Sequence, residues 1–137
     1  MGEIIHGVGI ILIRKDGAAL VQLRDDIPNI IYPNHWCYPG GSAEKEERFE
    51  EAAKRELVEE TGYKAEKLNL FLEEEHLTRS SKTAMRHLYW TTYDDKQEIV
   101  CGEGQEMRWM KPEEFTDKKF IPKQDEMYKT ALKLAGF

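Results

Sequence analysis

Residues 46–61 constrain the fold more than any other segment, because they contain neither glycine nor proline and are acidic at their start. Gly62 follows directly, at the position where a glycine in the left-handed conformation commonly ends a helix. The sequence therefore predicts a helix over residues 46–61, near the middle of the chain.

Segments with strand-like patterns lie on both sides of this helix. Residues 7–14 and 18–24 are apolar runs separated by the turn signal Lys15-Asp16-Gly17, which predicts a β-hairpin. Further strands or alternating segments are expected at residues 35–38, 68–79, 84–93 and 106–111, a loop at 25–34, and a terminal helix at 124–134 with Met127, Tyr128, Ala131 and Leu134 on its apolar side. This order predicts an α+β fold in which a mixed β-sheet is sandwiched between α-helices, an α/β/α sandwich.

Composition limits the classes of protein to which the chain can belong. Its 137 residues suit a single domain, residues 1–137, with one hydrophobic core. The 20 Lys and Arg against 26 Asp and Glu give a net charge of −6, so no global attraction to nucleic acid is expected. The longest apolar stretch, residues 8–13, is far below the roughly 20 residues that span a bilayer, and no membrane partner is expected. With no secretory pattern and only Cys37 and Cys101, we expect a cytoplasmic protein whose cysteines are packing residues.

The glutamates of the predicted helix are unusual in their position. At about 100° per residue, the apolar positions of the helix form one stripe. Its members are Phe49, Ala52, Ala53 and Leu57. Glu56 and Glu60 fall within about 20° of the reference direction set by Phe49, and Glu59 falls at the edge of the stripe. Three carboxylates are therefore expected on one partly apolar face.

Carboxylates in such positions repel one another and resist desolvation, so a positive partner is expected. Arg55 can offset one of them, whereas a hard divalent cation with oxygen ligands satisfies several at once. The alternative is a solvated acidic face, which is the usual explanation for glutamates on a helix. The opposite face already carries Glu47, Glu50, Glu51 and Lys54. This distribution favours a metal site.

These residues also follow a known pattern, because residues 41–63 resemble the Nudix box. That pattern is Gly, five residues, Glu, seven residues, Arg-Glu, an aliphatic residue, any residue, Glu-Glu, any residue, Gly and an aliphatic residue. The matching positions are Gly41, Glu47, Arg55, Glu56, Leu57, Glu59, Glu60, Gly62 and Tyr63. Tyr63 departs from the pattern by replacing an aliphatic residue, and Glu46 stands where many members have a glycine, which bears on the shape of the loop.

The chain is thus similar to MutT-like Nudix hydrolases, and the resemblance implies the Nudix fold and a Mg²⁺ or Mn²⁺ cofactor. It implies that the carbonyl of Gly41 and the carboxylates of Glu56 and Glu60 bind the metal, with Glu59 as a further metal ligand and catalytic candidate. Glu47 and Arg55 would orient these ligands.

A downstream segment, Gly102-Glu103-Gly104-Gln105, resembles a Glu-Gly-Gln segment of many family members, although it can also be a simple turn. The resemblance leaves either Glu56 or Glu103 as the general base.

Candidate substrate contacts are less specific. Arg24 resembles an arginine that often faces substrate phosphate in this family, and a surface arginine is the alternative. Gln124, after Pro122, stands where some MutT-like members place an amide that reads a purine edge. Candidates for stacking on a base are Trp36, Tyr32 and Trp109, although core packing is the more common fate of tryptophan. Weaker phosphate candidates are Arg79, Lys82, Arg86 and Arg108.

Together these features predict a metal-dependent pyrophosphohydrolase, a monomer or homodimer, that cleaves the diphosphate linkage of a nucleoside triphosphate or other nucleoside diphosphate derivative. One alternative is a catalytically silent Nudix-fold domain that binds a nucleotide as a sensor. Another is a purely structural acidic helix in an unrelated mixed-sheet protein. Sensors usually lose catalytic glutamates, whereas Glu56, Glu59 and Glu60 are all present here, which favours the enzyme.

Overall fold

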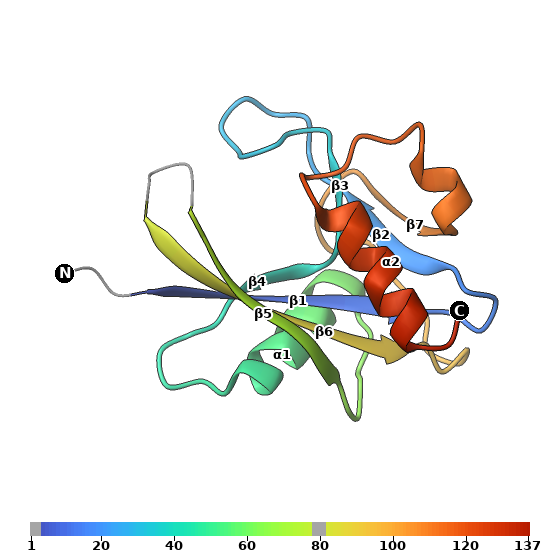
Figure 1. The fold of residues 1–137 in the computed structure, drawn as a ribbon, viewed down its shortest axis with the longest axis horizontal. Coiled ribbons are helices and arrows are strands. Elements are labelled where there is room, and N and C mark those ends of the chain that lie inside the picture. The colour runs from blue at the N-terminus through green and yellow to red at the C-terminus, as the bar shows by residue number, and fades with distance from the viewer. Residues whose placement is uncertain (1–3, 78–81) are drawn as a thin grey trace.

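The computed structural model describes residues 4–77 and 82–137 (Figure 1). Its elements are β1 (Ile5–Ile13), β2 (Ala19–Leu23), β3 (Trp36–Cys37), β4 (Gly40–Ser42), α1 (Phe49–Thr61), β5 (Asn69–Leu77), β6 (Thr83–Thr92), β7 (Glu106–Met110), a 3-10 helix (Pro112–Phe115) and α2 (Gln124–Leu134). The predicted hairpin, strands and helices are present, although residues 78–79 of the strand predicted over 68–79 lie outside the described residues. β4 is additional, because a segment as rich in glycine as Gly40–Ser42 carries no strand pattern.

The strands form one mixed sheet around β1, which runs parallel to β6 and antiparallel to β2 and β4. The path through the sheet is β3-β2-β1-β6-β5, and β7 pairs with β2. β1 and β2 pair at Ile13 and Ala19. The earlier part of β1 pairs instead with β4, where Gly40 and Gly41 lie opposite Gly9 and Val8. The sheet therefore divides after the hairpin, and the glycines of β4 lie beside the point of division.

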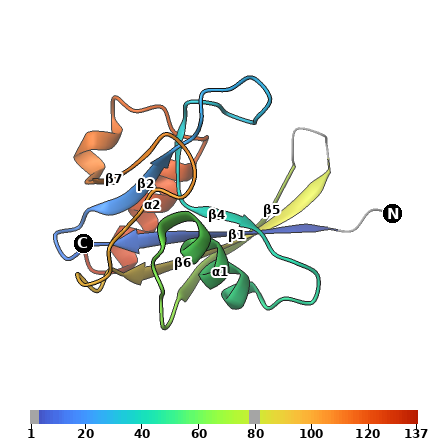
Figure 2. The ribbon, with the colours of Figure 1, turned by 180° about the vertical axis from the view of Figure 1, so that it is seen from behind.

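The two helices cover opposite faces of the sheet. α2 lies in front of the sheet in Figure 1, and α1 lies in front of it in the reverse view of Figure 2. Each face has its own apolar cluster: Ile11 and Val21 pack with α2, and Ile10 and Leu20 pack with α1. The predicted α/β/α sandwich is confirmed.

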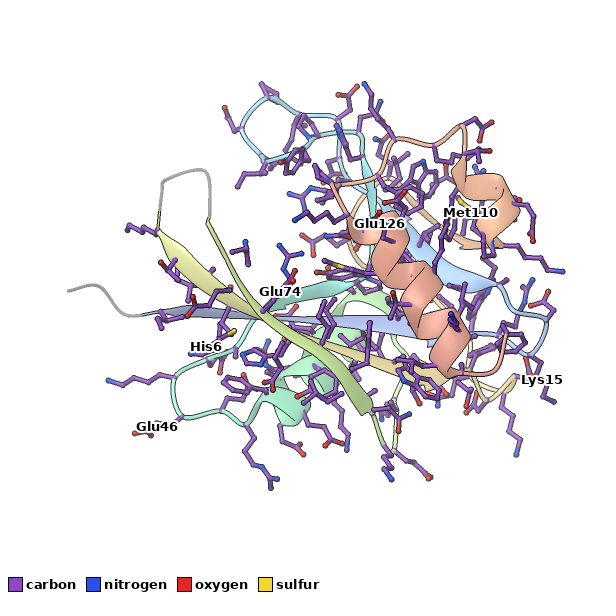
Figure 3. All side chains as sticks on the ribbon, in the orientation of Figure 1. His6, Lys15, Glu46, Glu74, Met110 and Glu126 are labelled. Atoms are coloured by element: carbon purple, nitrogen blue, oxygen red, sulfur yellow. The ribbon has the colours of Figure 1, made fainter. Side chains whose placement is uncertain are left out.

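Some details of the prediction are wrong. α1 begins at Phe49 rather than at residue 46, because Glu46 has a φ of 68° and Arg48 is extended. A left-handed backbone favours glycine, the residue that many members have at this position, so Glu46 adopts a backbone conformation that suits that glycine better; Figure 3 shows Glu46 on the loop before α1. On α2, Leu134 is exposed while Leu132 is buried in the core.

The structure also tests what the sequence predicts for the two cysteines and for membrane-spanning segments. Cys37 is buried, whereas Cys101 is exposed, so the prediction that both are packing residues is wrong for Cys101. Within residues 4–77 and 82–137, the structure contains no helix with the length and apolar character needed to cross a membrane.

Candidate active site

Two carboxylates of α1 point toward the sheet, as the helical spacing predicts. Glu60 is 5% exposed, and the side chain of Glu56 is 14% exposed. The side chain of Glu59 is 56% exposed. The expectation that all three share one inward face is therefore wrong for Glu59, which lies at the solvent edge.

The Glu60 carboxylate is held between β4 and the loop that follows residue 100. The Gly40 N–H donates to Glu60 Oε2 at 2.5 Å. Burial, together with a hydrogen bond shared with the carboxyl of Glu103, raises the pKa of Glu60 to about 9. Positive charge at this position would stabilise the ionised form of Glu60.

The Glu56 carboxylate lies directly against the backbone of Gly41. A Cβ atom at Gly41 would be 2.4 Å from Glu56 Cδ and 2.5 Å from both carboxylate oxygens. Only glycine leaves room for this carboxylate beside β4. The pKa of Glu56 is raised, chiefly by burial and against the opposing effect of Arg55.

Arg55 donates hydrogen bonds to three carboxylates of this region. Its Nε donates to Glu47 Oε2 at 2.9 Å, and its Nη1 donates to Glu56 Oε1 at 3.0 Å and to Glu59 Oε1 at 3.2 Å. Its Nη2 donates to the backbone oxygen of Ser42 at 3.1 Å. The guanidinium lowers the pKa of Glu47 to about 2. Arg55 and Glu47 thus tie the loop before α1 to β4 and to the inward carboxylates.

The loop containing Glu103 packs on the end of α1. The Gly102 N–H donates to Glu60 O at 2.8 Å, and a Cβ at Gly102 would be 2.5 Å from Glu59 O. Glu103 itself is exposed, and its carboxyl reaches Glu60. The structure therefore brings the downstream glutamate to the glutamates of the helix.

This set of oxygen donors fits a hard divalent cation in its chemistry. The carboxylates of Glu56 and Glu60 lie beside the Gly40–Gly41 backbone. When ionised, the glutamates of this region carry more negative charge than the single guanidinium of Arg55 can neutralise. Among residues 4–77 and 82–137, the structure contains no group of three or more His, Cys, Asp or Glu side chains already arranged as a ligand set. In this arrangement Arg55 engages both Glu56 and Glu59.

A cavity of about 630 Å³ opens on the other side of the Gly40–Gly41 segment. Its charged lining includes Arg24, Arg86 and Lys123, and no carboxylate is among the described residues that line it. Arg86 pairs with Glu74, with its Nε 3.4 Å from Glu74 Oε1. With Arg24 and Lys123 beside it, the lining still favours an anionic ligand in a protein with a net charge of −6.

Four of the candidate substrate residues line this cavity: Arg24, Tyr32, Arg86 and Gln124. Arg24 Nε donates to the backbone oxygen of Ile31 at 2.9 Å. The Tyr38 N–H donates to Gln124 Oε1 at 3.0 Å, which fixes the amide and leaves its nitrogen as the group presented to a ligand. Tyr32 lies in the loop between β2 and β3.

The structure does not bring the other candidates to the cavity. Trp36 is 6% exposed and packs in the core on the α2 side, with Arg108 over its ring at 5.2 Å, so the prediction that it binds substrate is wrong. Trp109 packs against Tyr93 with ring centroids 5.0 Å apart. Lys82 is exposed and is not among the described residues that line the cavity. Arg79 lies outside the described residues.

Sequence reasoning missed Tyr38, which lines the cavity and holds Gln124, and Gln22, a buried amide of β2 that bonds to the Glu103 loop. Tyr38 carries no sequence signal, because its role depends on a backbone N–H. Gln22 does carry one, since it is a polar residue within an apolar strand.

Known proteins with similar sequences and structures fit this picture. Nucleoside triphosphatase NudI from Escherichia coli O139:H28 (strain E24377A / ETEC) is 44% identical over 52 residues, which cover 37% of this chain and 36% of NudI. NudI from E. coli O17:K52:H18 (strain UMN026 / ExPEC) is 29% identical over 114 residues, covering 75% and 79%. The match to the first relative thus spans about a third of its length.

The fold is also found among solved structures. The NUDIX domain of Shewanella oneidensis NrtR, complexed with ADP ribose, superposes with a TM-score of 0.81 at 15% identity, covering 98% of this chain and 90% of that chain. Residues 5–131 match the NUDIX domain family, which is nearly the whole chain. The chain therefore belongs to the NUDIX domain family.

Proposed function

We propose that this protein is a Mg²⁺- or Mn²⁺-dependent pyrophosphohydrolase that cleaves the diphosphate linkage of a nucleoside triphosphate or another nucleoside diphosphate derivative. The observation that carries the proposal is the position of the Gly40–Gly41 segment. On one side it contacts the inward carboxylates Glu56 and Glu60, and on the other it lines a cavity rich in cations. The similarity to NudI, a nucleoside triphosphatase, supports the same class of substrate.

Glu56, Glu60 and the carbonyl of Gly41 are the groups that would hold the cation, with Glu59 as a further ligand from the solvent edge. When bound, the cation would neutralise the phosphate oxygens and lower the pKa of a coordinated water. Arg55 and Glu47 would keep Glu56 against β4 and orient Glu59 through their hydrogen bonds.

Glu103 is the better placed of the two candidate bases. The Glu56 carboxylate lies against the β4 backbone and accepts a hydrogen bond from Arg55, so in this proposal it is committed to holding the cation. Glu103 is exposed at the rim of the site, and its carboxyl reaches Glu60. A carboxylate so placed can take a proton from an attacking water.

The cavity would bind the nucleoside part of the substrate. Arg24 and Arg86 would face the phosphates attached to the nucleoside, and Tyr32 would offer an aromatic face to the base. Because the Tyr38 N–H occupies the oxygen of Gln124, this amide offers N–H donors, which match the carbonyl oxygens of a keto base better than an amino group.

The proposal is tested by incubating the purified protein with Mg²⁺ or Mn²⁺ and a panel of nucleotides, sugar nucleotides, dinucleoside polyphosphates and ADP-ribose. We expect release of phosphate or pyrophosphate from at least one class, and isotopically labelled water would show which phosphorus is attacked. Glu56→Gln should lower kcat by orders of magnitude, because it changes an inward carboxylate. Glu51→Gln is the matched control, since Glu51 is exposed on the same helix.

The same panel separates the enzyme from a binding domain. A protein that binds one of these ligands, shown by calorimetry, but releases no product with either metal would be a nucleotide sensor. No product from any substrate would disprove the proposed activity.

A further inference from the structure

A buried amide on β2 lies beneath the loop that contains Glu103. Gln22 is 4% exposed. Side chains alternate along a strand, so Gln22 shares a face with Leu20, which packs in the cluster on the α1 side. A buried amide requires a hydrogen-bond partner, and Gln22 Nε2 donates to the backbone oxygen of Glu103 at 2.6 Å. This bond links the core of the sheet directly to the residue that we propose as the base.

The bonds on either side of Glu103 hold the ends of the loop but not its centre. The Gly102 N–H donates to Glu60 O, and the Gln105 N–H donates to Leu23 O, both at 2.8 Å. At Glu103 itself, the carbonyl accepts from Gln22, and from the Cys101 thiol at 3.2 Å, which is a weak donor. The Gln22 amide is therefore the stronger side-chain anchor of the Glu103 peptide.

Gly104, the residue after Glu103, packs closely against the same Gln22 amide. Gly104 has a φ of 88°, and a Cβ there would be 2.5 Å from Leu23 O and 3.2 Å from Gln22 Nε2. The loop thus lies directly on the end of β2, in contact with the Gln22 amide. Without the Gln22 donor, the Glu103 carbonyl would keep only the weak Cys101 thiol as a side-chain donor, so no strong side-chain bond would fix the peptide between Gly102 and Gln105.

We infer that Gln22 is a positioning residue, which fixes the backbone of Glu103 so that its carboxyl is directed at the inward glutamates of α1. The inference rests on the proposed function, because Glu103 matters only if it takes part in the reaction. Gln22 is absent from the lining of the cavity, so it acts through Glu103 and leaves binding of the nucleoside part unchanged.

The test uses Gln22→Met, which removes the donor while nearly keeping the length of the side chain. We expect kcat to fall by about 10- to 100-fold, as for other groups that orient ligands or bases, with KM unchanged. Gln97→Met is the matched control, because its amide donates to Lys64 O and Asp94 Oδ2 in a surface loop. The control should lower the melting temperature and leave kcat unchanged. If Gln22→Met fails to fold, Gln22→Asn keeps a buried amide that is too short to reach Glu103.

A double-mutant cycle distinguishes this inference from the proposed function. Glu103→Gln should lower kcat by about 100-fold or more, and adding Gln22→Met should lower it no further. If the two losses multiply, or if Gln22→Met has wild-type kcat while Glu103→Gln is impaired, the inference is overturned and the role of Glu103 stands. If Glu103→Gln has wild-type kcat, the proposed base is wrong, and the inference fails with it.

Discussion

Replacing Gly41 with alanine tests whether the Glu56 carboxylate must lie against the β4 backbone. The new Cβ would be 2.4 Å from Glu56 Cδ, whereas carbon atoms in contact are about 3.5 to 4.0 Å apart. The carboxylate must therefore move by about 1 Å or more. Its hydrogen bond with Arg55, 3.0 Å long, must stretch or follow. A displacement of about 1 Å at a reacting centre costs roughly 100-fold in rate, which corresponds to about 2.7 kcal/mol.

The assay compares kcat, and the increase in melting temperature on adding Mn²⁺, for Gly41→Ala and the wild type. We expect kcat to be about 100-fold lower and the increase caused by Mn²⁺ to be lost, because a ligand that binds only the folded state stabilises it. Without metal the melting temperature should change little, since alanine is tolerated in a strand. Ser42→Ala is the control, because Arg55 contacts only its backbone oxygen. Wild-type kcat and an unchanged Mn²⁺ response in Gly41→Ala would refute the reasoning.

Three further predictions concern residues around this centre. Arg55→Gln should lower the melting temperature and should lower kcat by about 10- to 100-fold, because several carboxylates lose the guanidinium that they share. Calorimetry and initial rates measure the two effects, and wild-type values would contradict the prediction. Arg55 lowers the pKa of Glu47 from 4.5 to about 2, so this ion pair stabilises the fold above pH 5 and its contribution is lost as the pH falls to 2. The difference in melting temperature between the wild type and Glu47→Gln should shrink across that window, and a constant difference would count against the ion pair. Gln124→Leu should raise KM about 10-fold for substrates with keto bases and less for those with amino groups; equal changes with GTP, UTP, ATP and CTP would show that the amide orientation does not select the base.

The positions of the inward glutamates could be predicted because a helix has one dominant period. Given the period and the apolar stripe, Glu56 and Glu60 must face the sheet, and the structure places them there. The exposure of Glu59 does not follow from the period. It lies at the edge of the stripe, and its side chain is drawn outward to Arg55 at the i, i+4 position.

Features that depend on distant contacts could not be predicted. Trp36 is an aromatic residue of the kind that stacks on bases. Its strand, however, pairs with β2 and bridges to Phe120, which places its ring in the core. The start of α1 is a similar case. The residue type at position 46 does not signal a left-handed backbone, and only the glycine that many family members have there points to it; the next residue, Glu47, is fixed by Arg55 from the second turn of the helix.

The division of the sheet bears on how an acidic protein would bind an anion near a cluster of glutamates, as the proposed function requires. Where β4 replaces β2 as the neighbour of β1, the Gly40–Gly41 backbone separates the inward glutamates of α1 from the cavity. The carboxylates of Glu56 and Glu60 lie on one side of it, and a cavity with Arg24 and Arg86 lies on the other. A diphosphate held by the cations would meet the carboxylates at this segment, where like charges repel unless a divalent ion lies between them. In the proposed reaction, the arrangement that would select the ligand by charge would therefore also require a metal.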